Sequence, residues 1–235
     1  MELIFPHHCA GCGVAGYRLC LLCHQKLCSA PQRISTRVNM HIPTWSLGAL
    51  GGVRREVIIA LKERGRKDMI PYLGPIVRAA VEFLIAAGEL EEEIVLIPAP
   101  TRRLAASRRG GDPVYLVCRN TGFPTWKALE HTRSVKDSVG LSATQRRENM
   151  RHAVVPTAFL PPEQKWQLLA WLRQRAWVPS DGRGWRTPAT TRAISGLSVV
   201  LVDDVITTGA TLAASAQLLA SAGVQVRGAL GWSNA

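Results

Sequence analysis

Two adjacent carboxylates and a short loop of small residues carry the most specific chemistry in this chain. Asp203 and Asp204 follow an apolar run, and residues 207–211 read Thr-Thr-Gly-Ala-Thr before a helical pattern begins at residue 212. The amides of such a loop and the helix N-terminus point the same way and bind phosphate. Carboxylates repel phosphate, so the aspartates are better suited to hydroxyl groups or a metal ion on the same ligand. The combination predicts a sugar-phosphate site; the alternative is an ordinary strand-to-helix turn with a threonine cap.

A cysteine cluster near the N-terminus has the spacing of a metal site. Cys9 and Cys12 form one Cys-x-x-Cys knuckle, and Cys20 and Cys23 form a second. The two-residue gap lets both thiolates of a knuckle bind one tetrahedral ion. Disulfides are rare in a cytosolic chain, so the pattern predicts a structural zinc ion held by these four cysteines. Four further residues lie near enough in the sequence to compete as ligands: Cys28, His7, His8 and His24. Cys118, alone in an apolar helical pattern, is expected in the core.

The charge of the chain restricts its partners less than its motifs do. Basic residues outnumber acidic ones by 29 to 17, which gives a formal net charge of +12. Such an excess attracts polyanions, whether nucleic acid, anionic lipid or the pyrophosphate of a substrate. An arginine-rich proteome would produce the same excess without any such partner. The charge therefore supports a nucleic-acid partner without establishing one.

Neither a membrane span nor a secretion signal is expected. Residues 76–87 are the best candidate for a span, but they carry Arg78 and Glu82 and read as an amphipathic helix. The first eight residues lack the basic region and apolar core of a secretion signal. These patterns predict a cytoplasmic protein.

The elements that position the aspartates follow from hydrophobic periodicity. Residues 199–202 are four apolar residues in a row, which favours a strand buried on both faces of a parallel sheet. Helices are expected at 53–64, 70–88, 112–120, 145–151 and 212–222, and strands at 94–97, 126–131, 197–202 and 224–230. Strands and helices that alternate around glycine-ended turns predict an α/β fold, a mostly parallel sheet with helices on both faces.

A basic loop follows the strand expected at 94–97. Residues 98–101 read Pro-Ala-Pro-Thr, and Gly110 and Gly111 stand among the arginines that follow. These arginines are Arg102, Arg103, Arg108 and Arg109. A basic, glycine-containing loop after a strand is suited to neutralising a pyrophosphate or a nucleic-acid backbone. A solvated surface loop is the alternative for any one of these arginines.

Residues 199–211 resemble the binding motif for 5-phosphoribosyl 1-pyrophosphate (PRPP) in type I phosphoribosyltransferases. The resemblance implies that Asp203 and Asp204 contact the ribose hydroxyls as the catalytic acids. It also implies that Mg²⁺ bridges pyrophosphate and ribose oxygens of the bound PRPP. The implied PRPP- and phosphate-binding residues are Val205, Ile206, Thr207, Thr208, Gly209, Ala210 and Thr211. The implied candidates for the pyrophosphate side are Ala99, Pro100, Thr101, Arg102, Arg108 and Arg109.

Most of the chain resembles the ComF family, also called ComFC or GntX-like. Besides the knuckles and residues 199–211, the matching pieces are residues 61–66, Leu73-Gly74, residues 97–100, residues 108–110, residues 140–142 and residues 146–149. The resemblance implies a zinc-binding element at 1–30 and a phosphoribosyltransferase-like domain at 45–235. The chain departs from the family at residues 109–113, where Gly111-Asp112-Pro113 stands in place of Phe-Asn-Gln, and at Val135 and Ser138.

Two functions follow from the ComF resemblance. One is a PRPP-binding phosphoribosyltransferase that acts in DNA uptake, natural transformation or DNA processing, on an acceptor that the sequence does not identify. The other is a non-catalytic accessory that binds single-stranded DNA and a helicase partner, with the phosphoribosyl pocket as a sensor or a vestige. Type I relatives are often dimers, so a homodimer is also an expectation.

Residues 156–195 form an insertion relative to the ComF family. The insertion holds four of the seven tryptophans, and a helix is expected from Pro161 to Trp177. Aromatic side chains interleaved with arginines can stack on single-stranded nucleic acid and neutralise it, at about 1–3 kcal/mol per stacked base. The alternative, which the pattern favours, is a helix that covers the domain's own core or a dimer partner.

Overall fold

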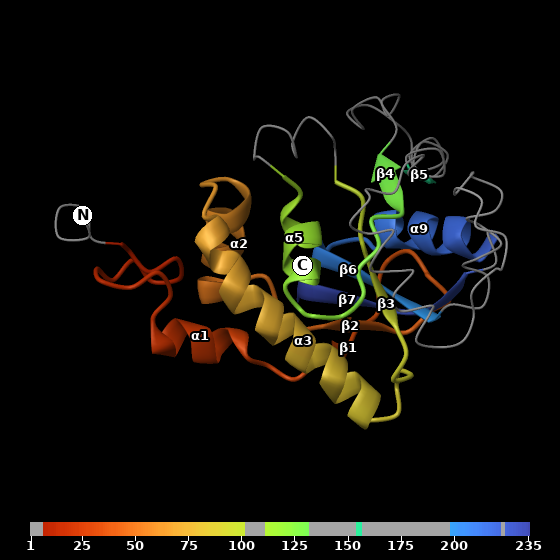
Figure 1. Cartoon of the computed structure of the whole chain (residues 1–235), viewed down its shortest axis with the longest axis horizontal. Coiled ribbons are helices and arrows are strands. Elements are labelled where there is room, and N and C mark those ends of the chain that lie inside the picture. The colour runs from red at the N-terminus through yellow and green to blue at the C-terminus, as the bar shows by residue number, and fades with distance from the viewer. Residues whose placement is uncertain (1–6, 102–110, 132–153, 157–197, 222–223) are drawn as a thin grey trace, which may run out of the picture.

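The computed structural model describes residues 7–101, 111–131, 154–156, 198–221 and 224–235. A five-stranded sheet with the order β1-β2-β7-β6-β3 forms its centre (Figure 1). Its strands are β1 (Gln32–Arg33), β2 (Thr44–Ser46), β3 (Val95–Pro98), β6 (Ser198–Ile206) and β7 (Gln225–Asn234). Neighbouring strands from β2 to β3 are parallel, and only β1 at the edge pairs antiparallel. The expected mostly parallel sheet is confirmed.

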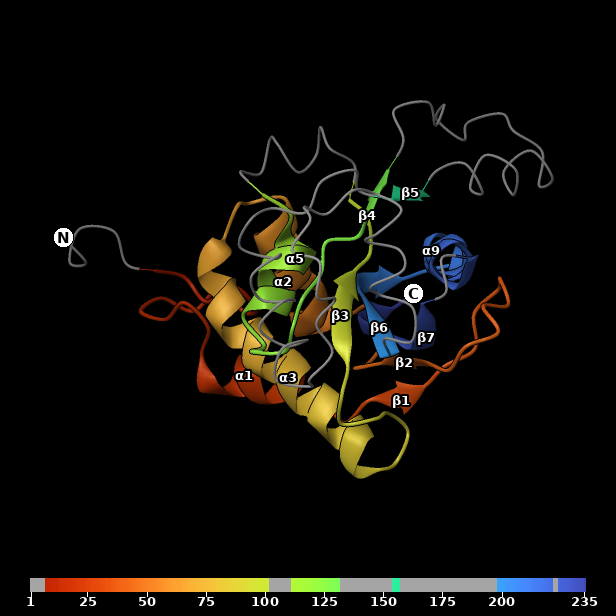
Figure 2. The same ribbon diagram turned by 45° about the vertical axis from the view of Figure 1, so that its right-hand side comes forward.

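Helices cover both faces of this sheet, as the alternating pattern predicts. The helices are α1 (Leu21–Leu27), α2 (Gly52–Lys62), the 3-10 helix η1 (Lys67–Met69), α3 (Ile70–Ala86), α5 (Pro113–Arg119) and α9 (Ala210–Ser221). Helices α2, α3 and α5 lie on one face and α9 on the other (Figure 2). A separate antiparallel pair, β4 (Leu129–His131) and β5 (Val154–Pro156), contacts α9 through β5. Each expected helix within the described residues forms with ends shifted by a few positions.

Strand β6 is buried on both faces. Val200 and Val202 pack into the cluster beneath α2 and α3, whereas Val199 and Leu201 pack into the cluster beneath α9. All four side chains are 0% exposed, so apolar residues are required at every position. The expectation that the strand ends before the aspartates is wrong. β6 continues to Ile206 because β7 pairs with it along its whole length.

Helix α3 is apolar because it is a core helix. By length and composition alone, Lys67–Ala86 could cross a membrane. Within the protein, however, Val77 and Val81 are 0% exposed in the core. Its outer face carries the ion pair between Arg78 and Glu82, whose charged atoms lie 2.7 Å apart. This burial accounts for the apolar composition, as in the interior helix of a globular protein.

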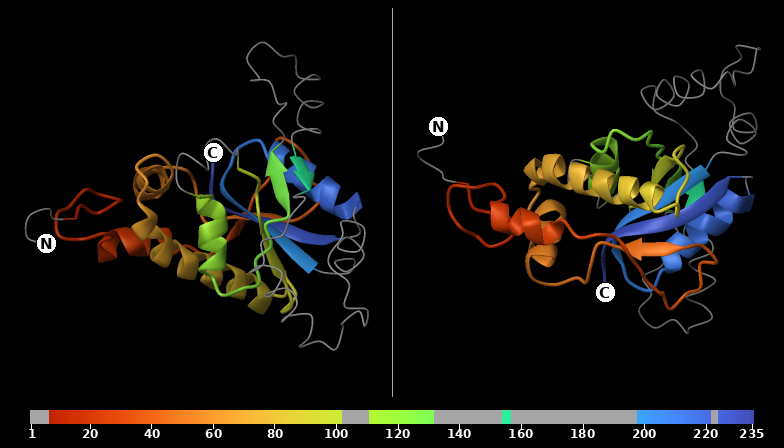
Figure 3. Two further views of the ribbon diagram at one scale, coloured as in Figure 1. Left: turned by 45° about the horizontal axis from the view of Figure 1, so that its top comes forward. Right: turned by 90° about the horizontal axis from the view of Figure 1, so that it is seen from below.

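The cysteine-bearing residues from 7 onward lie at one end of the molecule, next to α2 (Figure 3). Two arginines of the following segment hold them there. The side chain of Arg54 is buried and donates to the carbonyl oxygens of Lys26 and Leu27 at the end of α1, each at 3.4 Å. Arg66 donates to the carbonyl oxygen of His8 at 2.9 Å. The N-terminal element is therefore packed onto the helical layer.

Candidate functional site

The aspartates and the turn after β3 lie at the same edge of the sheet. The amide of Ala99 donates to the carbonyl oxygen of Val202 at 2.7 Å, which continues the register of β3 and β6 past Pro98. Parallel strands end on the same side, so the turn that follows Pro98 and the aspartates that follow Val202 lie at one edge although about a hundred residues separate them. This edge is where an open α/β sheet binds ligands.

The two aspartates have different environments. The side chain of Asp204 is 8% exposed, and its Oδ2 lies 2.7 Å from the ammonium of Lys62 at the end of α2. Asp203 accepts a hydrogen bond at Oδ1 from the amide of Asp204, at 2.9 Å. One carboxylate is therefore neutralised by a cation from another layer, and the other is held by the backbone of its own strand.

Asp203 takes up a proton more readily than an ordinary aspartate. Burial and the negative charge of Asp204 raise the pKa of Asp203 to about 8, and Asp112 adds to the increase. The amide of Asp204 and the charge of Lys62 act in the opposite direction. Two acids at close range cannot both ionise freely. At neutral pH, Asp203 can therefore donate a hydrogen bond as well as accept one.

Asp112 is a third carboxylate at this edge, and sequence reasoning did not place it in the site. Its side chain caps α5 by accepting hydrogen bonds from the amides of Val114 at 3.1 Å and Tyr115 at 3.3 Å. Burial raises the pKa of Asp112, against the charge of Lys127 and a hydrogen bond from Thr101. An aspartate before Pro113 has the pattern of a helix N-cap, and this signal could have located it.

The loop between β6 and α9 carries the residues of the predicted phosphate cradle. Thr207 and Thr208 are exposed, and α9 begins at Ala210 without an acidic residue in its first turn. Gly209 has a φ of 79°, and a Cβ added there would lie 2.9 Å from Cβ of Thr36. The amide of Val38 donates to the carbonyl oxygen of Thr208 at 3.0 Å. The loop is thus held from outside while its threonines face solvent.

Several predicted site residues contribute little side-chain surface here. Ile206 is 2% exposed within the core, and Ala99 is 3% exposed. Pro100 is also buried, and Val205 and Thr211 are half-buried. The predicted arginines Arg102, Arg108 and Arg109 lie outside the described residues, as does all of the insertion except residue 156. The assignment of all these residues to a ligand stays a prediction.

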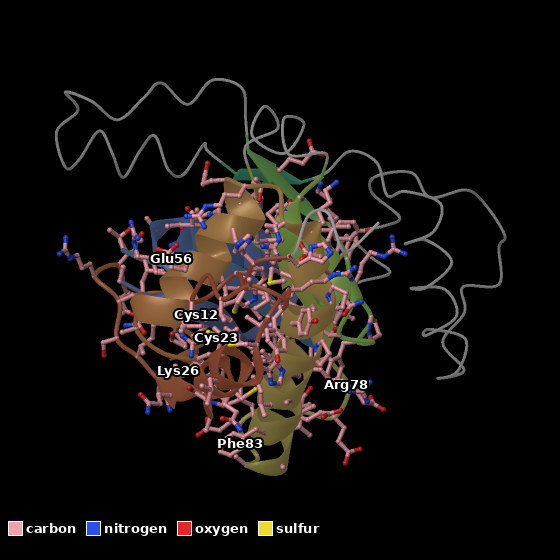
Figure 4. The ribbon with its side chains drawn as sticks, turned by 90° about the vertical axis from the view of Figure 1, so that its left-hand side faces the viewer. Cys12, Cys23, Lys26, Glu56, Arg78 and Phe83 are labelled. Carbon is pink, nitrogen blue, oxygen red and sulfur yellow. The ribbon has the colours of Figure 1, made fainter. Side chains whose placement is uncertain are left out.

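The four knuckle cysteines come together at the N-terminal element. Figure 4 shows two of them, Cys12 and Cys23, close to each other. The sulfurs of Cys9, Cys12, Cys20 and Cys23 all lie within 4.8 Å of one another. Sγ of Cys12 lies 3.8 Å from Sγ of Cys20. Tetrahedral thiolates about 2.3 Å from a central zinc ion would be about 3.8 Å apart. The four sulfurs therefore fit a metal ion such as zinc.

The alternative ligands are placed elsewhere. In the part of the chain that the structure describes, the group of side chains that could hold a metal ion consists of the four knuckle cysteines and includes none of the alternative ligands. Sγ of Cys28 lies 3.8 Å from Nδ1 of His24 and belongs to a separate contact. Cys118 is 0% exposed in the core, which confirms its expected structural role.

Among the knuckle cysteines, the surroundings of Cys9 favour the thiolate form. Burial opposes ionisation of Cys9, but hydrogen bonds from the amides of Cys20, Cys12 and Gly11 outweigh it and lower its pKa to about 6. Burial raises the pKa of Cys23, together with hydrogen bonds from the neighbouring thiols and the charge of Cys9. A bound cation would favour the thiolate form of Cys23 as well, so the donor set is suited to a metal ion.

Comparison with known families agrees with the geometry of β6 and its loop. Residues 139–234 match the family model of the phosphoribosyl transferase domain. The match includes β6, the loop, α9 and all of β7, and supports the type I phosphoribosyltransferase superfamily. No curated protein matches the chain. The finer resemblance to the ComF family stays a prediction.

Proposed function

We propose that the chain binds PRPP, or a closely related phosphoribosyl ligand, at the edge formed by β3 and β6. The observation that supports this proposal is the continuous segment 203–211, in which two carboxylates at the end of β6 precede the loop that leads into α9. The cradle binds the 5-phosphate through amides and threonine hydroxyls. Asp203 and Asp204 bind the ribose hydroxyls. The family match to 139–234 supports the same ligand class.

The reaction proposed for this site is phosphoribosyl transfer. The bond between the anomeric carbon of PRPP and pyrophosphate breaks, and a nucleophilic acceptor forms the new bond at that carbon. Mg²⁺ bound with the substrate would neutralise the pyrophosphate as it leaves. Asp203 and Asp204 hold the sugar in place while positive charge develops beside them. The turn at Ala99, Pro100 and Thr101 is the proposed neighbour of the pyrophosphate.

We further propose that Cys9, Cys12, Cys20 and Cys23 hold a structural zinc ion. Four protein ligands leave no open position for chemistry, so the ion would stabilise the N-terminal element alone. Reduced thiols require a reducing compartment such as the cytoplasm. The proposed division of the chain is a zinc element at 1–30 and a phosphoribosyltransferase-like domain at 45–235.

The proposed biological role is that of a ComF-type protein in DNA uptake or DNA processing. It rests on the ComF resemblance, with the net charge of +12 in support. The second candidate is an accessory without turnover that binds single-stranded DNA and a helicase, for which the same charge argues. DNA affinity that lacks a steep decrease with salt would contradict the electrostatic part of either role.

Calorimetric titration of PRPP with Mg²⁺ tests the ligand. The wild-type protein should bind, and Asp203→Asn with Asp204→Asn should weaken binding by about tenfold to a hundredfold, because the ribose hydroxyls lose the carboxylate of Asp204 and the carboxyl group of Asp203. Glu82→Gln is the matched control, since it removes an exposed carboxylate on α3. Absence of PRPP binding by the wild-type protein would overturn the proposal. Release of pyrophosphate with candidate acceptors then separates an enzyme from a binding protein.

A further inference from the structure

Lys62 connects the helical layer to the predicted ribose site. It is the last residue of α2, and its Nζ lies 2.7 Å from Oδ2 of Asp204 at the end of β6. The lysine side chain is 29% exposed and the aspartate side chain 8% exposed. An ion pair with one partner this enclosed is less screened by water than a surface pair.

Helix α2 holds Lys62 in a defined place relative to the sheet. Val57 and Leu61 on its inner face are at most 2% exposed. Near the start of the helix, Arg54 donates to the carbonyl oxygen of Trp232 in β7 at 3.1 Å. Just beyond its end, Arg66 forms hydrogen bonds to the carbonyl oxygens of His8 and Arg18. The ammonium is therefore presented by a fixed support.

The pairing leaves one oxygen of Asp204 for a ligand. Lys62 occupies Oδ2, and among the described residues no hydrogen-bond donor lies at Oδ1. Because Lys62 holds Oδ2, the position of Oδ1 of the same carboxylate is also fixed. Within the described part of the chain, the other charged groups at this edge are Asp203, Asp112 and, beside Asp112, Lys127.

We propose that Lys62 is a positioning residue of the sugar-phosphate site, which fixes Asp204 through Oδ2 so that Oδ1 accepts a hydrogen bond from a ribose hydroxyl. The inference rests on the proposed function and adds to it a residue of another structural layer. The ion pair of Lys62 is made with Asp204, whereas the phosphate loop is held by the amide of Val38, which donates to the carbonyl oxygen of Thr208, and lies against Thr36 at Gly209. Its removal should therefore impair recognition of the sugar and leave recognition of phosphate intact.

Binding of three ligands to the full chain tests this separation. Inorganic phosphate, ribose 5-phosphate and PRPP with Mg²⁺ are titrated against the wild-type protein, Lys62→Met, Lys62→Arg and Arg55→Met. Lys62→Met should weaken ribose 5-phosphate and PRPP by about tenfold or more and change phosphate affinity less than about twofold. Lys62→Arg, which keeps the cation, should recover most of the loss. Arg55→Met removes an exposed cation of the same helix and should change none of the three.

The outcomes separate this inference from the proposed function. If the wild-type protein gains affinity from the ribose but Lys62→Met binds ribose 5-phosphate as tightly, the role of Lys62 is wrong and the proposed function stands. If the wild-type protein binds phosphate and gains nothing from the ribose, both are wrong. Equal loss for phosphate and ribose 5-phosphate would show a general structural defect and overturn the positioning role.

A double-mutant cycle adds a test that tolerates some loss of stability. In the Asp204→Asn background, Lys62→Met should cause little further loss of ribose 5-phosphate affinity, because its effect passes through Asp204. A full additional loss in that background would overturn the inference. Phosphate affinity and thermal melting of each variant show that the compared proteins are folded. Lys62→Gln, which keeps a hydrogen-bond donor, replaces Lys62→Met if the latter does not fold.

Discussion

The guanidinium of Arg54 lies 3.1 Å from the carbonyl oxygen of Trp232 and so joins α2 to β7, the strand that pairs with β6. The same side chain reaches the end of α1 through Lys26 and Leu27. One buried cation thus connects the cysteine-bearing N-terminus, the helical layer and the sheet. Burial lowers the pKa of Arg54, against the charge of Cys28, but arginine remains a cation at any physiological pH.

Arg54→Met should destabilise the protein by about 2–4 kcal/mol, because it leaves buried carbonyl oxygens without a donor. Urea unfolding measures the change in the free energy of unfolding. Arg55→Met is the matched control, since that side chain is 57% exposed and should change stability by less than about 0.5 kcal/mol. Equal effects of the two substitutions would contradict the bridging role of Arg54.

Asp203→Asn should change the pH dependence of stability. The folded protein binds the Asp203 proton more tightly than the unfolded chain, because the folded pKa is about 8. This contribution is fully present below about pH 4 and is lost as the pH rises to about 8. Between these pH values, the wild-type protein should therefore lose stability relative to the variant by at most about 1.4 kcal/mol per pH unit. Solvent screening of the partly exposed Asp203 makes the loss smaller than this limit.

Urea unfolding of both proteins at pH 5 and pH 8 measures that difference. Asp68→Asn provides a control of opposite sign, since a hydrogen bond from Arg66 lowers the pKa of Asp68. Its contribution changes only in acid, so its difference from the wild-type protein should be constant between pH 5 and pH 8. Parallel curves for the wild-type protein and Asp203→Asn would show that Asp203 has an ordinary pKa.

Gly209→Ala should abolish most phosphate binding. The residue has a φ of 79°, and its new Cβ would lie 2.9 Å from Cβ of Thr36, so the loop must shift. Strain in the left-handed region costs about 1 kcal/mol, and the displaced amides should lower phosphate affinity by about tenfold or more. Gly88→Ala is the matched control, because Gly88 has a φ of 72° but open space around it, so the substitution should add the same backbone strain without changing phosphate affinity. Unchanged phosphate affinity in Gly209→Ala would argue against this loop as the cradle.

Cys23→Ser should reduce the bound zinc and lower thermal stability, because three thiolates bind the ion less tightly than four. Metal analysis of protein purified under reducing conditions without chelators should give about one zinc per wild-type chain. Cys28→Ser is the control, since Cys28 contacts His24 outside the cluster. Equal zinc content in wild-type protein and Cys23→Ser would contradict the assignment of Cys23 as a ligand.

The parts of the site that lie within one short segment could be predicted from the sequence. The spacing of Asp203, Asp204 and residues 207–211 is preserved in space because one strand, one turn and one helix carry them. The cysteine knuckles come together for the same reason, since two-residue gaps impose their own geometry. The end of β6 was missed because its length depends on the partner strand β7.

What the sequence alone determined is therefore the local chemistry: a buried strand that leads through two acids into a phosphate-type loop, and four thiols at metal-binding spacing. Tertiary structure decided which distant groups surround that chemistry. Lys62, Asp112 and Thr36 come from three other segments, and no local pattern marks a lysine at a helix end as the partner of Asp204. Such contacts arise from the packing of layers, where burial makes the charge of one residue determine the protonation of another.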